Sequence, residues 1–181
     1  MTILNETILK DGRLLVLRRS RVSDAQQILD YLNTVGGESD NLMFGKEGCR
    51  SITVAQEAEH IEKLSSSPNT LLMVGLVGGR IVSLSQIRGE TPPRVSHNFQ
   101  LSITVLKAFW GLGIGTASMA VLLAFARKRG AKAVHLGVRA GNDVAIHLYE
   151  KFGFVRAGLH RGFFNINGVY HDEILMDLYF D

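Results

Sequence analysis

The sequence predicts a domain of the α/β (α+β) class, in which helices flank a mixed sheet. Two observations lead to this prediction. Strand-like segments are joined by the dipeptides Gly78-Gly79 and Asn167-Gly168, which are typical of tight hairpin turns. Between these hairpins a strand, a helix and a second strand follow one another, and such a unit adds strands to the same sheet. With 181 residues, 46% of them hydrophobic, we expect one domain over residues 1–181 with a substantial core.

Periodicity and turn residues place the individual elements. Alternating apolar and polar residues mark strands, and glycines end the later helices. Capping-box signatures precede both early helices: Ser23 with Gln26, and Thr53 with Gln56. The expected elements in chain order are a strand over 14–19, a helix over 23–36, a loop over 36–50, a helix over 53–64, strands over 70–77, 80–87 and 94–105, a helix over 116–129, a strand over 133–138, a helix over 142–152, and strands over 154–164 and 169–180.

Charge distribution argues against nucleic acid as the main partner. Residues 1–90 hold ten Lys and Arg against eleven Asp and Glu, a net of −1, while residues 91–181 hold ten against six, a net of +4. No basic run is longer than Arg127-Lys128-Arg129, and a nucleic-acid-binding domain would carry a longer basic stripe. The net positive charge of residues 91–181 has two interpretations of about equal weight: it binds a small polyanionic ligand, or it belongs to solvated helix ends.

Cysteine content and hydropathy exclude further classes. Cys49 is the only cysteine, which excludes a disulfide framework and a Cys-based zinc cluster, and nothing marks it as an activated thiol. The histidines show no metal-ligand spacing, so we expect no metal. The longest apolar run, residues 119–126, is far shorter than the about 20 residues of a membrane helix, and no signal peptide is recognisable. We therefore expect a cytoplasmic protein that does not bind membranes.

A glycine-rich segment from Trp110 to Thr116, Trp-Gly-Leu-Gly-Ile-Gly-Thr, lies between a predicted strand and a predicted helix. Glycines let the backbone approach a ligand closely, and the free N–H groups of a helix start attract phosphate. No lysine follows, as a Walker A loop requires, and Thr116 stands where a dinucleotide fingerprint starting at Gly111 needs its third glycine. The segment indicates another kind of phosphate site, or a tight strand–helix turn without a ligand.

A second motif opens the helix predicted over 142–152. Asn142 suits the N-cap, and its amide could also reach a ligand. Tyr149 lies two helical turns further on, so both residues point to roughly the same side. Considered alone, a tyrosine at this place indicates amphipathic packing more often than catalysis.

Taken together, these segments resemble the GNAT superfamily of acyl-CoA N-acyltransferases. The resemblance rests on Leu101-Ser-Ile-Thr-Val105, the glycine-rich loop over 110–116 and the pattern Asn142-x-x-Ala145-x-x-x-Tyr149-x-x-x-Gly153-Phe154. The order of elements extends it over nearly the whole chain. It implies a mixed, mostly antiparallel central sheet of six to seven strands flanked by about four helices. Trp110 departs from the Arg or Gln of the family pattern, which leaves the backbone donors in place but supplies no side-chain cation.

The resemblance also implies what individual residues do. Acetyl-CoA would be the co-substrate, and its pantetheine chain would pair with the backbone of Ile103, Thr104 and Val105 as an added strand does. An N–H near Val105 would polarise the thioester carbonyl, and Tyr149 would protonate the departing thiolate. Asn142 would also contact the cofactor. The pyrophosphate would lie on the backbone of the loop residues Trp110, Gly111, Leu112, Gly113, Ile114, Gly115 and Thr116.

The general base remains open at this stage. Many members of the family carry a Glu near position 100, where this chain has Gln100, a side chain that cannot accept a proton. His97, on the same predicted strand, is a candidate base because histidine titrates near neutral pH. The alternative is a histidine that packs beside a neighbouring side chain. Glu38 and Asp40 are further candidates that could instead bind a cationic substrate, although loops are commonly polar in any case.

These observations lead us to expect an N-acetyltransferase that moves the acetyl group of acetyl-CoA directly to a primary amine of a small molecule or a protein N-terminus. The alternative is a non-catalytic acyl-CoA-binding or sensing module on the same fold. Glu38, Asp40 and Glu47 form an acidic loop that could attract a polyamine, an aminoglycoside or a protein N-terminus. The closing strand, residues 174–180, is apolar enough to pack in a homodimer, and burial within the monomer explains it equally well.

Overall fold

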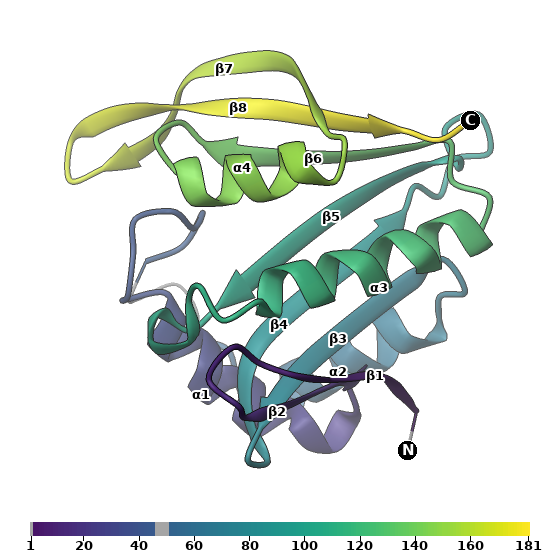
Figure 1. The fold of residues 1–181 in the computed structure, drawn as a ribbon, viewed down its shortest axis with the longest axis vertical. Coiled ribbons are helices and arrows are strands. Elements are labelled where there is room, and N and C mark those ends of the chain that lie inside the picture. Colours follow the sequence, from purple (N-terminus) through teal and green to yellow (C-terminus); the bar gives the residue numbers. More distant parts are fainter. Residues whose placement is uncertain (1, 46–50) are drawn as a thin grey trace.

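The computed structural model describes residues 2–45 and 51–181, so Glu47 and Cys49 lie outside the described residues. Its strands form one eight-stranded sheet in the order β1-β2-β3-β4-β5-β6-β8-β7 (Figure 1). In chain order the elements are β1 (Ile3–Ile8), β2 (Leu14–Arg19), the 3₁₀ helix η1 (Val22–Asp24), α1 (Ala25–Val35), α2 (Val54–Ser66), β3 (Thr70–Val77), β4 (Arg80–Gly89), β5 (Asn98–Val105), the 3₁₀ helix η2 (Lys107–Phe109), α3 (Ile114–Lys128), β6 (Ala133–Arg139), α4 (Asp143–Lys151), β7 (Val155–Ile166) and β8 (Val169–Tyr179).

The predicted class is confirmed, with one strand more than expected. Every neighbouring strand pair is antiparallel except β5 with β6, which is parallel. The prediction missed β1, whose residues are exposed or half-buried at the edge of the sheet. Because Ile-Leu-Asn-Glu-Thr-Ile buries no continuous face, its sequence carries no alternating pattern to read.

The two predicted capping boxes have different outcomes. The box before α2 is confirmed, since the Thr53 Oγ1 accepts the Gln56 N–H and the Gln56 Oε1 accepts the Thr53 N–H. The box at Ser23 is wrong, because η1 occupies that position. Asp24 there forms a buried pair with Arg18, at 2.6 Å, and accepts the Arg21 N–H at 2.8 Å. The buried Asp24 carboxylate, which accepts hydrogen bonds from Arg18 and Arg21, therefore takes the place of the predicted Ser23 cap.

The strand predicted over 94–105 begins only at Asn98. Residues 93–97 form turns instead, in which the Val95 N–H donates to the Pro92 carbonyl and the Asn98 N–H to the Val95 carbonyl. Pro92 and Pro93 cannot donate to a sheet ladder, which explains why the alternating pattern did not extend the strand. His97 consequently lies in a turn.

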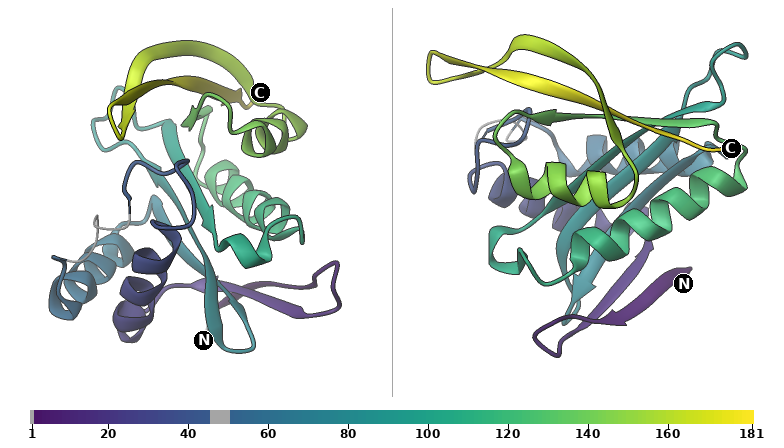
Figure 2. Two further views of the ribbon diagram at one scale, coloured as in Figure 1. Left: turned by 90° about the vertical axis from the view of Figure 1, so that its left-hand side faces the viewer. Right: turned by 45° about the horizontal axis from the view of Figure 1, so that its top comes forward.

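Helices cover both faces of the sheet. Helices α1 and α2 pack on one face, against β4 and β3, while α3 crosses the other face over β4 and β5. Helix α4 lies on the same side as α3, as two views agree (Figures 1 and 2). Within the part of the chain that the structure describes, no helix is long and apolar enough to cross a membrane.

The centre of the sheet is split. Strand β5 pairs with β6 only through Asn98–Gln100, opposite Ala133, Val134 and His135. Beyond these residues the two strands diverge (Figure 1). We call the open stretch, residues 101–105 of β5 and 136–139 of β6, the splay. Parallel strands cannot diverge in this way without leaving backbone groups unpaired, so the splay is where a ligand can take the place of a strand.

The closing strand β8 lies between β6 and β7. Its Met176 is fully buried and its Leu178 is 7% exposed. Burial within the monomer therefore accounts for these two residues, whereas Tyr179 is 64% exposed, and packing in a homodimer stays a prediction.

Candidate functional site

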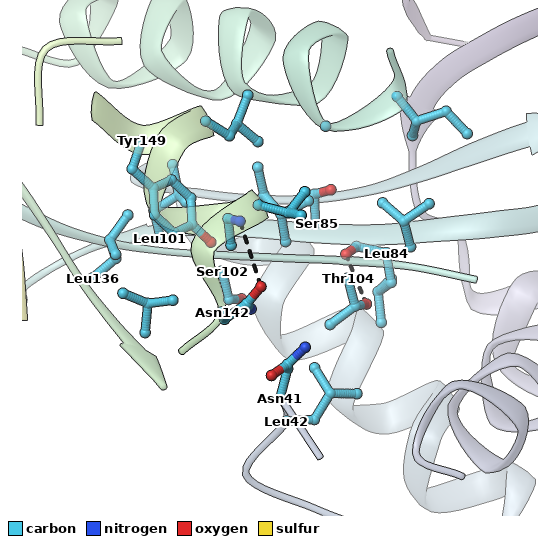
Figure 3. A pocket seen from close by; sticks show the side chains of 18 of the residues that line it. Asn41, Leu42, Leu84, Ser85, Leu101, Ser102, Thr104, Leu136, Asn142 and Tyr149 are labelled. Atoms are coloured by element: carbon cyan, nitrogen blue, oxygen red, sulfur yellow. Dashed lines mark hydrogen bonds between the residues drawn. The ribbon is translucent and has the colours of Figure 1, made fainter. Parts of the chain in front are cut away.

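A cavity of about 2110 Å³ opens at the splay. It is lined by β5, the loop that follows β5, the start of α4, β6, the β7–β8 pair and the segment after α1. Tyr149, Asn142, Leu101 and Ser102 surround its centre (Figure 3). The structure thus brings together the β5 edge, the glycine loop and the α4 motif that the sequence singled out separately.

The glycine loop presents its backbone to open space. Gly111 and Gly113 have φ values of +75° and +100°, which L side chains rarely adopt. No protein atom lies within 4 Å of the place where a Cβ would stand on either residue. Gly113 is also the N-cap of α3, so the first N–H groups of this helix point into the same space. The donor set and the open space suit a phosphate group.

Trp110 uses its side chain within the loop. Its indole Nε1–H donates to the Val105 carbonyl at 2.8 Å, and 45% of the residue is exposed. This bond closes the turn between β5 and α3. Where the family pattern has a polar Arg or Gln side chain, this chain therefore has an indole that braces the loop.

The β5 edge offers backbone groups at alternate residues. In the β4–β5 register Thr104 is opposite Leu84, and the Leu106 N–H donates to the Val82 carbonyl. Because paired residues alternate in antiparallel ladders, the backbone of Thr104 faces β4 while that of Ile103 and Val105 faces the splay. Ile103 and Val105 are therefore the candidate backbone partners of a ligand, and the predicted Thr104 backbone contact is wrong. The side-chain hydroxyl of Thr104 accepts the Tyr31 O–H at 2.8 Å.

Tyr149 projects from α4 with its hydroxyl directed into the cavity (Figure 3). The residue is 8% exposed, and its ring lies 5.9 Å from that of Phe154, centroid to centroid. Burial raises the pKa of Tyr149 to about 12. The hydroxyl therefore keeps its proton at neutral pH and is available as a hydrogen-bond donor.

Asn142 is the N-cap of α4, as predicted. Its Oδ1 accepts the Ala145 N–H at 3.4 Å, and the half-buried residue lines the cavity. Since the cap uses the side-chain oxygen, the amide nitrogen keeps its two N–H donors for a ligand.

His97 lies apart from this constellation. It is exposed, precedes β5 at the closed end of the splay, and is absent from the residues that line the cavity. Its main-chain carbonyl accepts the N–H groups of Lys132 and Ala133. The mechanism proposed below consequently does not use His97 as a base.

Glu38 and Asp40 also lie outside the cavity lining. The Glu38 carboxylate accepts the Lys107 N–H at 2.6 Å, which ties the segment after α1 to the loop after β5. Asp40 is exposed. From this segment, the neighbouring residues Asn41 and Leu42 line the cavity instead (Figure 3).

Sequence reasoning missed two pairs of polar residues on the C-terminal strands. His160 on β7 and Glu173 on β8 approach to 2.9 Å, and we call them the open-end pair. His135 on β6 and Asp177 on β8 approach to 2.8 Å, and we call them the closed-end pair. All four line the cavity. No local motif marks them, because only the strand register brings each histidine to its carboxylate. Within residues 2–45 and 51–181, no group of three or more His, Cys, Asp or Glu side chains is placed to hold a metal ion.

Comparison with known proteins gives a consistent picture. The sequence model described as "Acetyltransferase (GNAT) family" matches residues 43–154. The N-alpha-acetyltransferase RimI of Mycobacterium tuberculosis is 36% identical over 106 residues, which are 57% of this chain and 63% of that protein. An N-alpha-acetyltransferase of Sulfurisphaera tokodaii is 28% identical over 157 residues, 86% of this chain and 89% of that protein.

The fold has a close counterpart among solved structures. The acetyltransferase of GNAT family from Streptococcus pneumoniae superposes with a TM-score of 0.87 at 27% identity, covering 92% of this chain and 99% of that one. The structural similarity therefore extends well beyond the residues that the family's sequence model matches.

Proposed function

The chain belongs to the GNAT family of acetyltransferases, and we propose that it transfers the acetyl group of acetyl-CoA directly to a primary amine of a small molecule or a protein N-terminus. One observation carries the proposal. A single cavity joins an unpaired strand edge, a left-handed glycine loop at a helix start and a protonated, buried tyrosine. These three features suit an amide chain, a pyrophosphate and a leaving thiolate respectively.

The binding half of the site consists mainly of backbone. Ile103 directs its N–H and C=O groups into the splay, where the amides of a pantetheine chain can pair with them as a strand would, and Val105 adds its N–H. The N–H groups from Gly111 to Thr116 converge at the N-terminus of α3, where the helix dipole favours negative charge. Asn142 adds side-chain donors from the start of α4. Bound acetyl-CoA supplies the reactive thioester.

The Val105 N–H is positioned to polarise the thioester carbonyl. Val105 is part of strand β5, and its carbonyl accepts a hydrogen bond from the Trp110 indole, so the position of its N–H is fixed. A donor that is already oriented stabilises the developing oxyanion without a reorganisation cost, which in other enzymes contributes about 2.7–4 kcal/mol for a single donor.

Tyr149 acts mainly as a hydrogen-bond donor to the leaving sulfur. Its pKa is about 12, whereas a thiol titrates near ~8.5. Complete proton transfer from the phenol to an isolated thiolate would thus be uphill by about 5 kcal/mol at 1.36 kcal/mol per pKa unit. The hydroxyl instead stabilises sulfur as negative charge develops, and it passes on a proton only while it receives another.

Two assays test this function. Acetyl-CoA at ~100 times its dissociation constant should stabilise the protein by about 2.7 kcal/mol, with no matching effect of NAD. Amine-dependent thiol release is then measured with spermidine, an aminoglycoside, free L-amino acids and peptides with a free N-terminus. Stabilisation by acetyl-CoA together with thiol release for at least one amine is expected. Stabilisation without thiol release for any amine would favour the non-catalytic module instead.

A further inference from the structure

The open-end and closed-end pairs lie on one face of the C-terminal strands. Glu173 is opposite Arg139 in the β6–β8 register and opposite His160 in the β7–β8 register, and opposed residues share a face. The Arg139 guanidinium contacts the Asn41 side chain, 3.3 Å away on the segment after α1. This face therefore looks toward the α1 side of the sheet, while helix α4, which carries Tyr149, lies on the other side (Figure 2).

The Glu173 carboxylate rests directly on the backbone of Gly137. A Cβ at position 137 would overlap the Oε1 and Cδ atoms of Glu173, so only glycine leaves room for the carboxylate. Gly137 lies two residues beyond His135, the last β6 residue that pairs with β5. The carboxylate is thereby placed on the β6 wall of the splay, whereas the closed-end pair sits where β5 and β6 are still joined.

The two members of the open-end pair differ in their access to water. The Glu173 side chain is 10% exposed and the His160 side chain 52% exposed. A carboxylate that is nearly buried on a cavity wall is available to a cation that enters the cavity, because its remaining oxygen lone pairs need donors. The imidazole bonded to it reaches solvent, so a proton taken up at the carboxylate has a path out.

Resting on the proposed function, we propose that Glu173 binds the ammonium group of the acceptor and takes its proton, and that His160 passes this proton to solvent. The acceptor is accordingly an amine that arrives protonated and enters from the α1 side of the splay. No motif in the sequence indicated Glu173 or His160 for these roles.

The proton count of the reaction fits this arrangement. An acceptor R–NH₃⁺ first gives one proton to Glu173, and His160 releases it to solvent. The freed nitrogen lone pair forms the C–N bond to the acetyl carbon, and the C–S bond breaks with its electron pair on sulfur. The second proton leaves the nitrogen as the amide forms and ends on the thiolate, to which Tyr149 donates a hydrogen bond. The products are an acetamide, CoA thiol and one proton in solution.

Other titratable and charged groups surround the open-end pair. Among the described residues, Arg139 faces it from β6, His171 from β8 and the closed-end pair from further along both strands. His171 Nδ1 lies 3.4 Å from the Arg139 guanidinium. These groups are shared by the parent protein and the variants below, so differences between pH profiles report on the altered residue.

The decisive experiment compares Glu173→Gln with Asp177→Asn. Each substitution removes one carboxylate charge from the same strand and retains an oxygen that can accept a bond from histidine. With acetyl-CoA and the fastest amine of the panel above, we expect Glu173→Gln to lower kcat by about 10²–10⁴-fold, the range for general acid–base groups. Its residual rate should rise toward high pH, where the free amine is already neutral. Acetyl-CoA affinity should match the parent, and Asp177→Asn should retain a parental rate and pH profile.

His160→Gln provides a second test that does not depend on the buried carboxylate. The His160 ring stacks only on Phe163, which is itself 49% exposed, so the fold should persist, and kcat should fall less than in Glu173→Gln with an altered pH profile. Parental kcat and pH profile in Glu173→Gln would overturn the inference, and so would equal losses in Glu173→Gln and Asp177→Asn. A parent protein that releases thiol with none of the amines would contradict the proposed function itself, which is a different result from equal rates in parent and variant.

Discussion

The two sides of the splay differ in the groups that they offer to a ligand, mainly backbone groups on one side and side chains on the other. On the α3 and α4 side, backbone groups of β5 and of the glycine loop form most of the candidate donor site, with Tyr149 and Asn142 added from one helix. On the α1 side, the candidate acceptor site is made of side chains from β6, β7 and β8 that meet only through strand register. The first arrangement suits a ligand whose amides and phosphates never vary, and the second can change its specificity one side chain at a time.

Removal of the Tyr149 hydroxyl should have the largest effect on the donor side. Tyr149→Phe keeps the ring against Phe154, so the melting temperature and the acetyl-CoA affinity should stay near parental values. We expect kcat to fall by about 10²–10⁴-fold, because the lost bond acts on the developing thiolate. Rates, calorimetry and melting on one preparation check this. Parental kcat would remove Tyr149 from the mechanism.

Gly137→Ala tests the acceptor side without touching a polar side chain. The new Cβ must displace the Glu173 carboxylate, so kcat should fall toward that of Glu173→Gln while acetyl-CoA affinity is unchanged. The matched control is the same substitution in a Glu173→Gln background, where we expect no further loss because both changes act on one group. Fully additive losses in this double-mutant cycle would contradict the coupling.

Gly113→Val should act on donor binding alone. A β-branched residue at φ +100° is strained, and its side chain would fill the open space before the loop. Loss of a single charge-assisted bond to phosphate costs about 1.5–3 kcal/mol, or roughly 10- to 150-fold in acetyl-CoA affinity. Gly79→Val is the control, since Gly79 has φ +79° and open surroundings in the β3–β4 turn. Equal acetyl-CoA affinities for both variants would refute the phosphate assignment.

Trp110→Phe should have the smallest effect. It removes the N–H that donates to the Val105 carbonyl together with part of a ring that is 45% exposed, and the lost bond is expected to contribute about 0.5–1.5 kcal/mol. Acetyl-CoA should bind roughly 2- to 10-fold more weakly, with kcat little changed. Titration calorimetry detects this difference. An affinity equal to the parent would show that the indole does not brace the loop.

The sequence predicts the donor side far better than the acceptor side, for a physical reason. Glycines such as Gly113 and a cap such as Asn142 are local requirements of the backbone, so they are legible in a short stretch of sequence. His97 was misplaced because Pro92 and Pro93 end the alternating ladder before β5 begins. No motif in the neighbouring sequence identifies Glu173, because its position depends on Gly137 and His160, which lie on two other strands.

Initial rates with acetyl-CoA and the amine varied together test the central claim most directly, namely that both substrates meet in the splay and the acetyl group passes straight from one to the other. Direct transfer requires a ternary complex of enzyme, acetyl-CoA and amine, so double-reciprocal plots at several amine concentrations should give intersecting lines. Parallel lines, the signature of a covalent acetyl-enzyme, would contradict the account.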